Sequence, residues 1–275
     1  MTGPVDTLEP PAPAVEPRIW QRRVVVLREQ GRRRLRWVIA GAAVVVLVVV
    51  LLVVLHSPVL ALRHIWVRGA TNTGTAAVVD AAGLSGSTPL VDIDTAATAS
   101  RVERLPWVAR AVVTRNWPDG VTVTVTERVP VAGIAHPGSG PVREYALVDA
   151  GGHVLTWSPA VPPGLPTLVA PVAPGPAGTV LAEAARPGLS VVGALPPALT
   201  ARVLRVVVAP GAHVWLDLGH RQSVALGAAS HLPAKLAALT SVLAAGPASG
   251  AAVIDVTVPD EPTVGPPTAG APPWR

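Results

Sequence analysis

The feature that most constrains the fold is an uncharged stretch of 19 residues from Trp37 to Leu55, WVIAGAAVVVLVVVLLVVL. As a helix rising 1.5 Å per residue it would be about 28 Å long, close to the roughly 30 Å of hydrocarbon in a bilayer. The 36 residues before it, and its own length, are both unlike a cleaved signal peptide. The stretch therefore predicts one uncleaved transmembrane helix, with a signal peptide and a buried core helix as the alternatives.

Charge on the two sides of this stretch predicts its orientation. Residues 1–36 carry eight arginines and four acidic residues. Positive residues stay on the cytoplasmic side of a membrane, so we expect residues 1–36 inside and residues 56–275 outside. The remaining 14 basic residues are nearly balanced by 13 acidic ones, so the basic excess lies in the segment next to the membrane. This position indicates membrane lipid as a partner and no nucleic acid.

The outer part of the chain must fold on an apolar core. It has no cysteine, so disulfides cannot stabilise it. Residues 56–275 are long enough for two modest domains. By contrast, the proline-rich start and the arginine-rich remainder of residues 1–36 predict a disordered cytoplasmic tail.

The first outer domain shows the order strand, helix, helix, strand, strand. A strand is expected within 64–71, a helix over 72–83 capped by Asn72 or Thr73, and a second helix capped by Asp94. Two strands then flank the tight turn Pro-Asp-Gly at 118–120. In the second of them the valines alternate strictly with threonines, which predicts one buried face.

The second outer domain is predicted to be rich in strands. A hairpin is expected around Gly151 and Gly152, and further strands at 202–209, 212–218, 222–226 and 252–258. Residues 158–176 are expected to form a surface loop because they are crowded with prolines. A helix after Ser230 and another one broken at Pro187 complete the α+β pattern.

Motifs for covalent or nucleotide chemistry are absent from the sequence. The single lysine, Lys235, follows Leu232 by three residues and Ala234 directly, so neither an SxxK motif nor a phosphate-binding loop is present. The segment GLSGS at 83–87 misses the nucleophile-elbow pattern. The seven histidines lack zinc-site spacing, so we expect no metal and no cofactor.

The acidic and aromatic residues are expected to have structural roles. Asp92 and Asp94 are expected in a turn and a helix cap, and Glu127 with Arg128 is expected to form a solvated ion pair. A carboxylate pair that meets only in the fold remains open as an alternative. Five tryptophans in strand-like segments are expected in the core: Trp66, Trp107, Trp117, Trp157 and Trp215.

These pieces together resemble a known family. VRGAT at 67–71, PLVDID at 89–94, LPWVARAVVTRNWPDGVTVTVTERVPVA at 105–132, LVDAGG at 147–152 and LPTL at 165–168 resemble the FtsQ/DivIB cell-division proteins. The resemblance implies an α+β chain in which a transmembrane helix precedes a POTRA domain and a second β-rich domain with flanking helices. The expected segments are a tail at 1–36, the helix at 37–55, the POTRA domain at 62–130, the β domain at 131–260 and a proline-rich tail at 261–275.

The resemblance also implies a function. Members of this family are non-catalytic scaffolds that recruit septal wall-synthesis proteins, and their partners are the single-span proteins FtsB and FtsL. The alternatives are a membrane-anchored wall hydrolase and a POTRA-bearing export component. An exposed strand edge can pair with an extended segment of a partner. By resemblance the edge lies near the carboxyl end, at Val256, Thr257, Val258, Pro259, Asp260, Glu261, Pro262, Thr263 and Val264.

Overall fold

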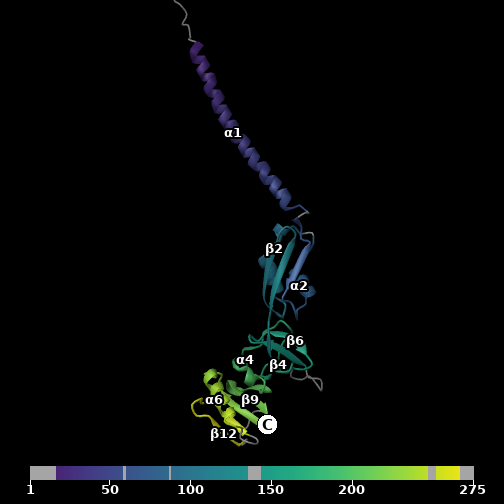
Figure 1. The fold of residues 1–275 in the computed structure, drawn as a ribbon, viewed down its shortest axis with the longest axis vertical. Helices are drawn as coiled ribbons and strands as arrows, with labels where there is room; N and C mark the ends of the chain where they lie inside the picture. Colours follow the sequence, from purple (N-terminus) through teal and green to yellow (C-terminus); the bar gives the residue numbers. More distant parts are fainter. Residues whose placement is uncertain (1–16, 58–59, 87, 136–143, 247–251, 267–275) are drawn as a thin grey trace, which may run out of the picture.

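The computed structural model describes residues 17–57, 60–86, 88–135, 144–246 and 252–266, with side chains from residue 34 onward. A long helix leads into a small domain built on a three-stranded sheet, and a larger domain on a nine-stranded sheet follows (Figure 1). The three parts follow one another along the length of the molecule. The α+β class and this order agree with the expectation from the sequence.

The first helix, α1, runs from Pro17 to Leu55. Its residues Arg34–Leu55 have a mean hydropathy of 3.5 and none of this stretch is buried in the protein, so it has the length and composition of a single membrane span. The expected disorder of the whole tail is wrong for residues 17–36, which are helical. The helix begins at the last proline before the span, because proline is tolerated in a first turn and no later residue of α1 breaks it. Residues 1–16 lie outside the described residues.

The small domain has the predicted order of two helices between its first two strands. Strand β1 is parallel to β3 and β2 is antiparallel to it, so β3 is central. The alternation in β3 is confirmed, because Val121, Val123 and Val125 are all buried against the two helices. The elements are β1 His64–Arg68, α2 Thr75–Ala82, the short 3₁₀ turn η2 Leu90–Asp92, α3 Thr95–Val102, β2 Val108–Asn116 and β3 Gly120–Glu127.

The two helix starts of the small domain differ. Asp94 caps α3 as predicted, since its side chain accepts from the N–H groups of Ala96 and Ala97 at 3.0 Å each. The predicted cap of α2 is wrong, because Gly74 occupies that position without a side-chain bond. Asn72 and Thr73 instead donate to the carboxylate of Glu127 at the end of β3. The two residues predicted as caps of α2 therefore join the loop before this helix to the end of β3.

The large domain is one sheet in the order β12-β11-β10-β9-β8-β7-β4-β5-β6. Most of its strands fall where they were predicted, but β7 lies in the expected proline-rich loop and β12 in the expected carboxyl tail. The strands are β4 Pro130–Ala135, β5 Tyr145–Asp149, β6 Val154–Ser158, β7 Thr167–Val169, β8 Arg205–Ala209, β9 His213–Gly219, β10 Gln222–Gly227, β11 Ala252–Asp255 and β12 Thr263–Gly265.

Helices α4 Arg186–Ala194, α5 Pro197–Thr200 and α6 Leu232–Ala244 belong to the same domain. Pro187 lies in the first turn of α4, so it begins the helix and does not break one in two. The next residue, Gly188, permits close packing on the sheet, because a Cβ there would lie 2.4 Å from Leu168 Cδ1. In α6, the buried Nζ of Lys235 donates to the carbonyl oxygens of Leu226 and Ala228 at 2.8 Å each. These contacts attach both helices to the central strands.

The expectation that five tryptophans fill the core is wrong. None of them is buried: Trp66 is 45% exposed, Trp117 is 54% exposed, and the other three are partly buried. The cores consist of valine, leucine, isoleucine and alanine. The inward positions of the strands are filled by smaller aliphatic side chains, whereas the five tryptophans lie where their rings are exposed or only partly buried.

We predict that Glu127→Ala destabilises the small domain. The carboxylate accepts from Asn72 N and Nδ2 and from Thr73 N and Oγ1 at 2.7–2.9 Å. Discounted for water access, loss of these bonds costs about 2 kcal/mol of unfolding free energy at pH 7. Burial raises the pKa of Glu127, but these hydrogen bonds outweigh it and hold the pKa below its ordinary value. The stabilisation is therefore complete above the unfolded-state pKa and is lost as the pH falls through the lower folded-state value.

Urea unfolding of residues 56–275 at pH 7 and below pH 4 checks this prediction. The control is Glu183→Ala, because Glu183 is 75% exposed and pairs only with the exposed Arg186. Equal stability of Glu127→Ala and the parent at pH 7 would show that the carboxylate is not structural.

Candidate partner-binding edge

The edges of the two sheets are candidate binding sites, because an edge strand has backbone N–H and C=O groups without strand partners. The four edge strands are β1, β2, β6 and β12. Glu103 Oε1 covers part of β2 by accepting from Ala111 N at 3.0 Å. Residues 178–181 cover the start of β6, where Val154 N donates to Thr179 O and Gly178 N donates to Val154 O, each at 2.8 Å. Among the described residues, β1 and β12 have no such cover.

Strand β12 forms a hairpin with β11. Their register pairs Val253 with Gly265, Ile254 with Val264 and Asp255 with Thr263. On its other side β11 is parallel to β10, and this pairing continues past the strand because Val256 N donates to Ala225 O at 3.0 Å. The edge is thus firmly joined to the rest of the sheet.

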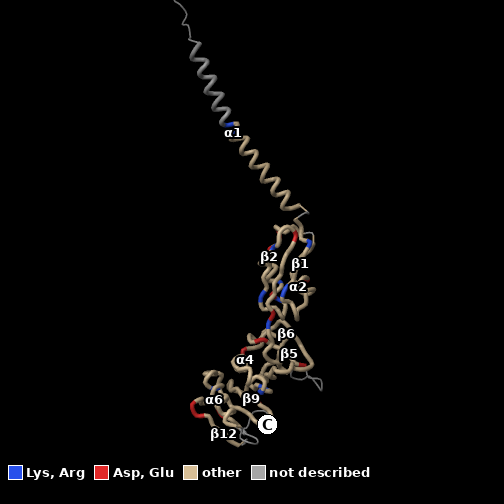
Figure 2. The backbone as a smooth tube through the Cα atoms, viewed as in Figure 1, with Lys and Arg blue, Asp and Glu red and all other residues tan. Residues whose placement is uncertain are grey.

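The loop between β11 and β12 turns the chain back. Asp255 Oδ1 accepts from Thr257 N at 2.8 Å and from Thr257 Oγ1 at 2.7 Å. Further along, Glu261 N donates to Val258 O at 3.2 Å, which closes a tight turn. Asp260 and Glu261 are both exposed, and Figure 2 shows acidic residues on this loop beside β12.

The nine residues predicted as one continuous edge occupy three different positions. Val256 is fully buried in the core, the next six residues form the loop, and only Thr263 and Val264 lie in the edge strand. Proline lacks an N–H group, so Pro259 and Pro262 cannot continue a ladder. Sequence reasoning missed that the turn-forming residues after Val256 signal a hairpin. It also missed that Gly265 belongs to the edge strand.

The orientation of this sheet relative to the small domain depends on a two-residue junction. Only Arg128 and Val129 separate β3 from β4. Arg128 Nη1 donates to Asp149 Oδ2 at 2.8 Å and lies 3.1 Å from His153 Nδ1, while His153 N donates to Asp149 Oδ1 at 2.8 Å. Burial raises the pKa of Asp149, but the His153 N–H and the Arg128 guanidinium hold the pKa below its ordinary value. The expected ion pair between Glu127 and Arg128 is therefore wrong, because each residue has other partners.

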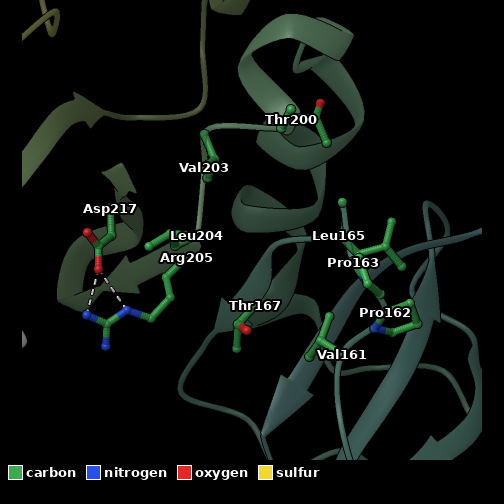
Figure 3. Close-up of a pocket in the computed structure, with 12 residues that line it drawn as sticks. Val161, Pro162, Pro163, Leu165, Thr167, Thr200, Val203, Leu204, Arg205 and Asp217 are labelled. Carbon is green, nitrogen blue, oxygen red and sulfur yellow. Dashed lines mark hydrogen bonds and ion pairs between the residues drawn. The ribbon is translucent and has the colours of Figure 1, made fainter. Parts of the chain in front are cut away.

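A pocket of about 560 Å³ lies between the 161–165 loop and the start of β8 (Figure 3). At its rim Arg205 donates from Nε and Nη2 to Asp217 Oδ2 at 2.9 and 2.6 Å. These two charges satisfy each other, and the rest of the lining is mostly proline, valine and leucine. In the described part of the chain, no group of three or more His, Cys, Asp or Glu residues is placed to hold a metal.

The carboxylates buried in the described residues are Asp149 and Asp217, and each is bound by an arginine. Asp94 is a cap as predicted, and Asp92 lies in the turn η2 with His56 Nε2 3.6 Å away. The described geometry therefore brings together structural ion pairs and, in the large sheet, one open strand edge.

An apolar helix with the length and composition of one membrane span, followed by a small domain of order βααββ, is the arrangement of a protein of the POTRA class. The model of the FtsQ-type POTRA domain matches residues 60–128. With the relatives described below, this match shows that the chain belongs to the FtsQ family of cell-division proteins.

Three relatives illustrate the similarity. The cell division protein FtsQ of Streptomyces collinus is 32% identical over 214 residues, which cover 74% of this chain and 77% of that protein. FtsQ of Mycolicibacterium smegmatis is 34% identical over 76% of this chain and 58% of its own length. FtsQ of Mycobacterium tuberculosis H37Rv is 30% identical over 76% of this chain and 62% of its own length. The chain thus spans about three fifths of the mycobacterial relatives it matches.

We predict that Arg128→Met weakens the junction and lowers the unfolding free energy of the large domain by about 2 kcal/mol, because Asp149 loses a charged donor while it stays largely buried. Urea unfolding of residues 56–275 measures this loss. Arg186→Met is the control, since its pair with Glu183 is exposed. Similar small effects of both substitutions would contradict a structural role for Arg128.

Proposed function

We propose that the protein is a non-catalytic, single-span scaffold of the division machinery that links septal wall-synthesis proteins through protein–protein contacts. Membership of the FtsQ family supports a role in division. The open edge at β12, at the end of the large sheet opposite the partly covered edge β6, is the observation that carries the scaffold role. It offers backbone groups to a partner strand, and the buried carboxylates are already used by arginines.

The proposed topology has residues 1–36 in the cytoplasm and residues 56–275 outside, at the division septum. The arginine cluster before the span supports this orientation, since no comparable excess follows it. Both sheets then lie on the side where the wall is built. A partner with its own membrane helix would meet them there.

The proposed partners are FtsB-like and FtsL-like single-span proteins, which connect the scaffold indirectly to septal wall synthases. A strand added to β12 would gain about two or three backbone hydrogen bonds at roughly 1 kcal/mol net each. Packing on the exposed Val258 and Val264 would add to this. Because both proteins are confined to one membrane, their effective concentration is high and a modest intrinsic affinity is enough.

Two truncations test the edge. We expect a chain ending at Pro262 to lose co-purification of FtsB-like and FtsL-like partners, because it lacks β12 but keeps the buried Val256 and the turn. A chain ending at Pro266 keeps β12 and should capture the partners at the parental level. Pull-down from membranes solubilised in mild detergent measures both, and a melting curve checks that each truncated chain is folded.

Capture by the 1–262 chain at the parental level would place the interface elsewhere. Loss of capture by both chains would place it beyond Pro266 and would equally contradict the use of β12.

The topology has its own test. A reporter that is active only outside the cytoplasm should be active when fused after Arg275 and inactive when fused before Met1. Protease added to spheroplasts should digest residues 56–275, since they are expected to lie on the outer face. Protection of these residues from the protease would overturn the proposed orientation.

A further inference from the structure

The small domain lies directly against the end of the membrane helix (Figure 1). His56 follows the last residue of α1, and its Nδ1 bonds to Leu52 O at 2.9 Å. Its Nε2 lies 3.6 Å from Asp92 Oδ1 in η2. Leu62 is already buried in the domain core, only seven residues after Leu55. The end of the domain that carries η2 is therefore the end next to the membrane surface.

The turn between β2 and β3 lies at this same end. Asp119 O accepts from Arg63 N at 2.8 Å and from His64 N at 3.2 Å, so the turn sits beside the start of β1. The register agrees, because His64 pairs with Gly120 and Asn116 also pairs with Gly120. The β2–β3 turn therefore projects toward the surface from which α1 emerges.

Two exposed tryptophans mark this end of the sheet. Trp117 begins the turn and is 54% exposed. Trp66, 45% exposed, lies over Gly120, where a Cβ would come within 2.3 Å of Trp66 Cζ3. Its ring stacks on His64 with centroids 5.6 Å apart. The opposite end of the same sheet face presents Arg110, Thr126 and Thr124 to water.

Charge at the membrane-facing end is mixed. His64 Nδ1 lies 3.4 Å from Asp119 Oδ2, and His56 faces Asp92. Among the described residues, Arg63, Arg115 and Asp94 also lie at this end. Such a surface has no strong attraction to anionic lipid, whereas an indole ring is favoured at the headgroup level of any bilayer because it is apolar with one polar N–H.

From this geometry we propose that the β2–β3 turn is a second membrane contact, with the Trp117 ring in the lipid headgroup region and Trp66 beside it. The occupant of this exposed patch is the lipid surface, because the span of the same chain ends next to it. The contact gives the small domain two attachments, the helix and the turn, and so limits its tilt on the membrane. The proposal rests on α1 crossing a bilayer and not on the identity of the division partners.

A spin label tests the contact in the full-length chain, which has no native cysteine. Asn116→Cys places a nitroxide next to Trp117. Thr126→Cys is the matched control on the same sheet face, six residues further along β3 than the partner of Asn116, or about 20 Å away. Both chains are reconstituted into phosphatidylcholine nanodiscs, and accessibility to oxygen is compared with accessibility to a water-soluble nickel chelate.

We expect the label at 116 to be several-fold less accessible to the nickel chelate than the label at 126, and more accessible to oxygen. Adding Trp117→Ser to Asn116→Cys should raise chelate access to the level of the control, while Trp117→Tyr should keep it low. Equal chelate access at both positions, or no effect of Trp117→Ser, would overturn the proposal. A low chelate access that appears only with added phosphatidylglycerol would also overturn it, because the contact would then be electrostatic.

Failure of the anchor gives a different result. A chain that does not incorporate into nanodiscs would refute the membrane span itself, and a chain that incorporates with its 116 label in water refutes only the second contact.

Discussion

Two consecutive residues, Glu127 and Arg128, make charge-assisted hydrogen bonds that stabilise the small domain and its junction with the large one. The Glu127 carboxylate binds the loop before α2 and so ties the first strand region to the last strand of the small domain. The Arg128 guanidinium binds Asp149 in the next sheet. Neighbouring side chains on an extended backbone point to opposite sides, so opposite charges at these two positions can serve two different domains. The Arg128–Asp149 bond and the two-residue junction thus lie where the small domain passes into the large sheet.

The edges of the two sheets differ in how far other groups of the chain cover them. Open edges invite aggregation, and here a glutamate side chain covers part of β2 and a returning segment covers the start of β6. Strand β12 is short, and the acidic loop next to it limits pairing with further copies of this edge by like-charge repulsion. An edge of this kind suits a specific partner strand better than self-association.

Sequence reasoning recovered the parts of the fold that depend on local pattern. The uninterrupted apolar stretch, the valine alternation of β3 and the Asp94 cap each follow from spacing along the chain, and all three are present. The parts it missed depend on partners far apart in sequence. Glu127 lies 54 residues from Thr73, and β7 is a three-residue strand made stable only by the neighbours on both sides. The nine predicted edge residues fall in the loop and strand after β11, and the reversal between Asp255 and Thr263 was missed although turn-forming residues lie between them.

The single lysine of the chain is only 4% exposed, in α6. The positive charge on the described surface is therefore carried by arginine, whose guanidinium stays protonated throughout the physiological pH range. Lysine acetylation, lysine ubiquitination and cross-linking at lysine all require an accessible lysine amine, and the described surface presents none. Its positive charge is consequently permanent, and control over this protein through lysine chemistry would first require α6 to leave the sheet.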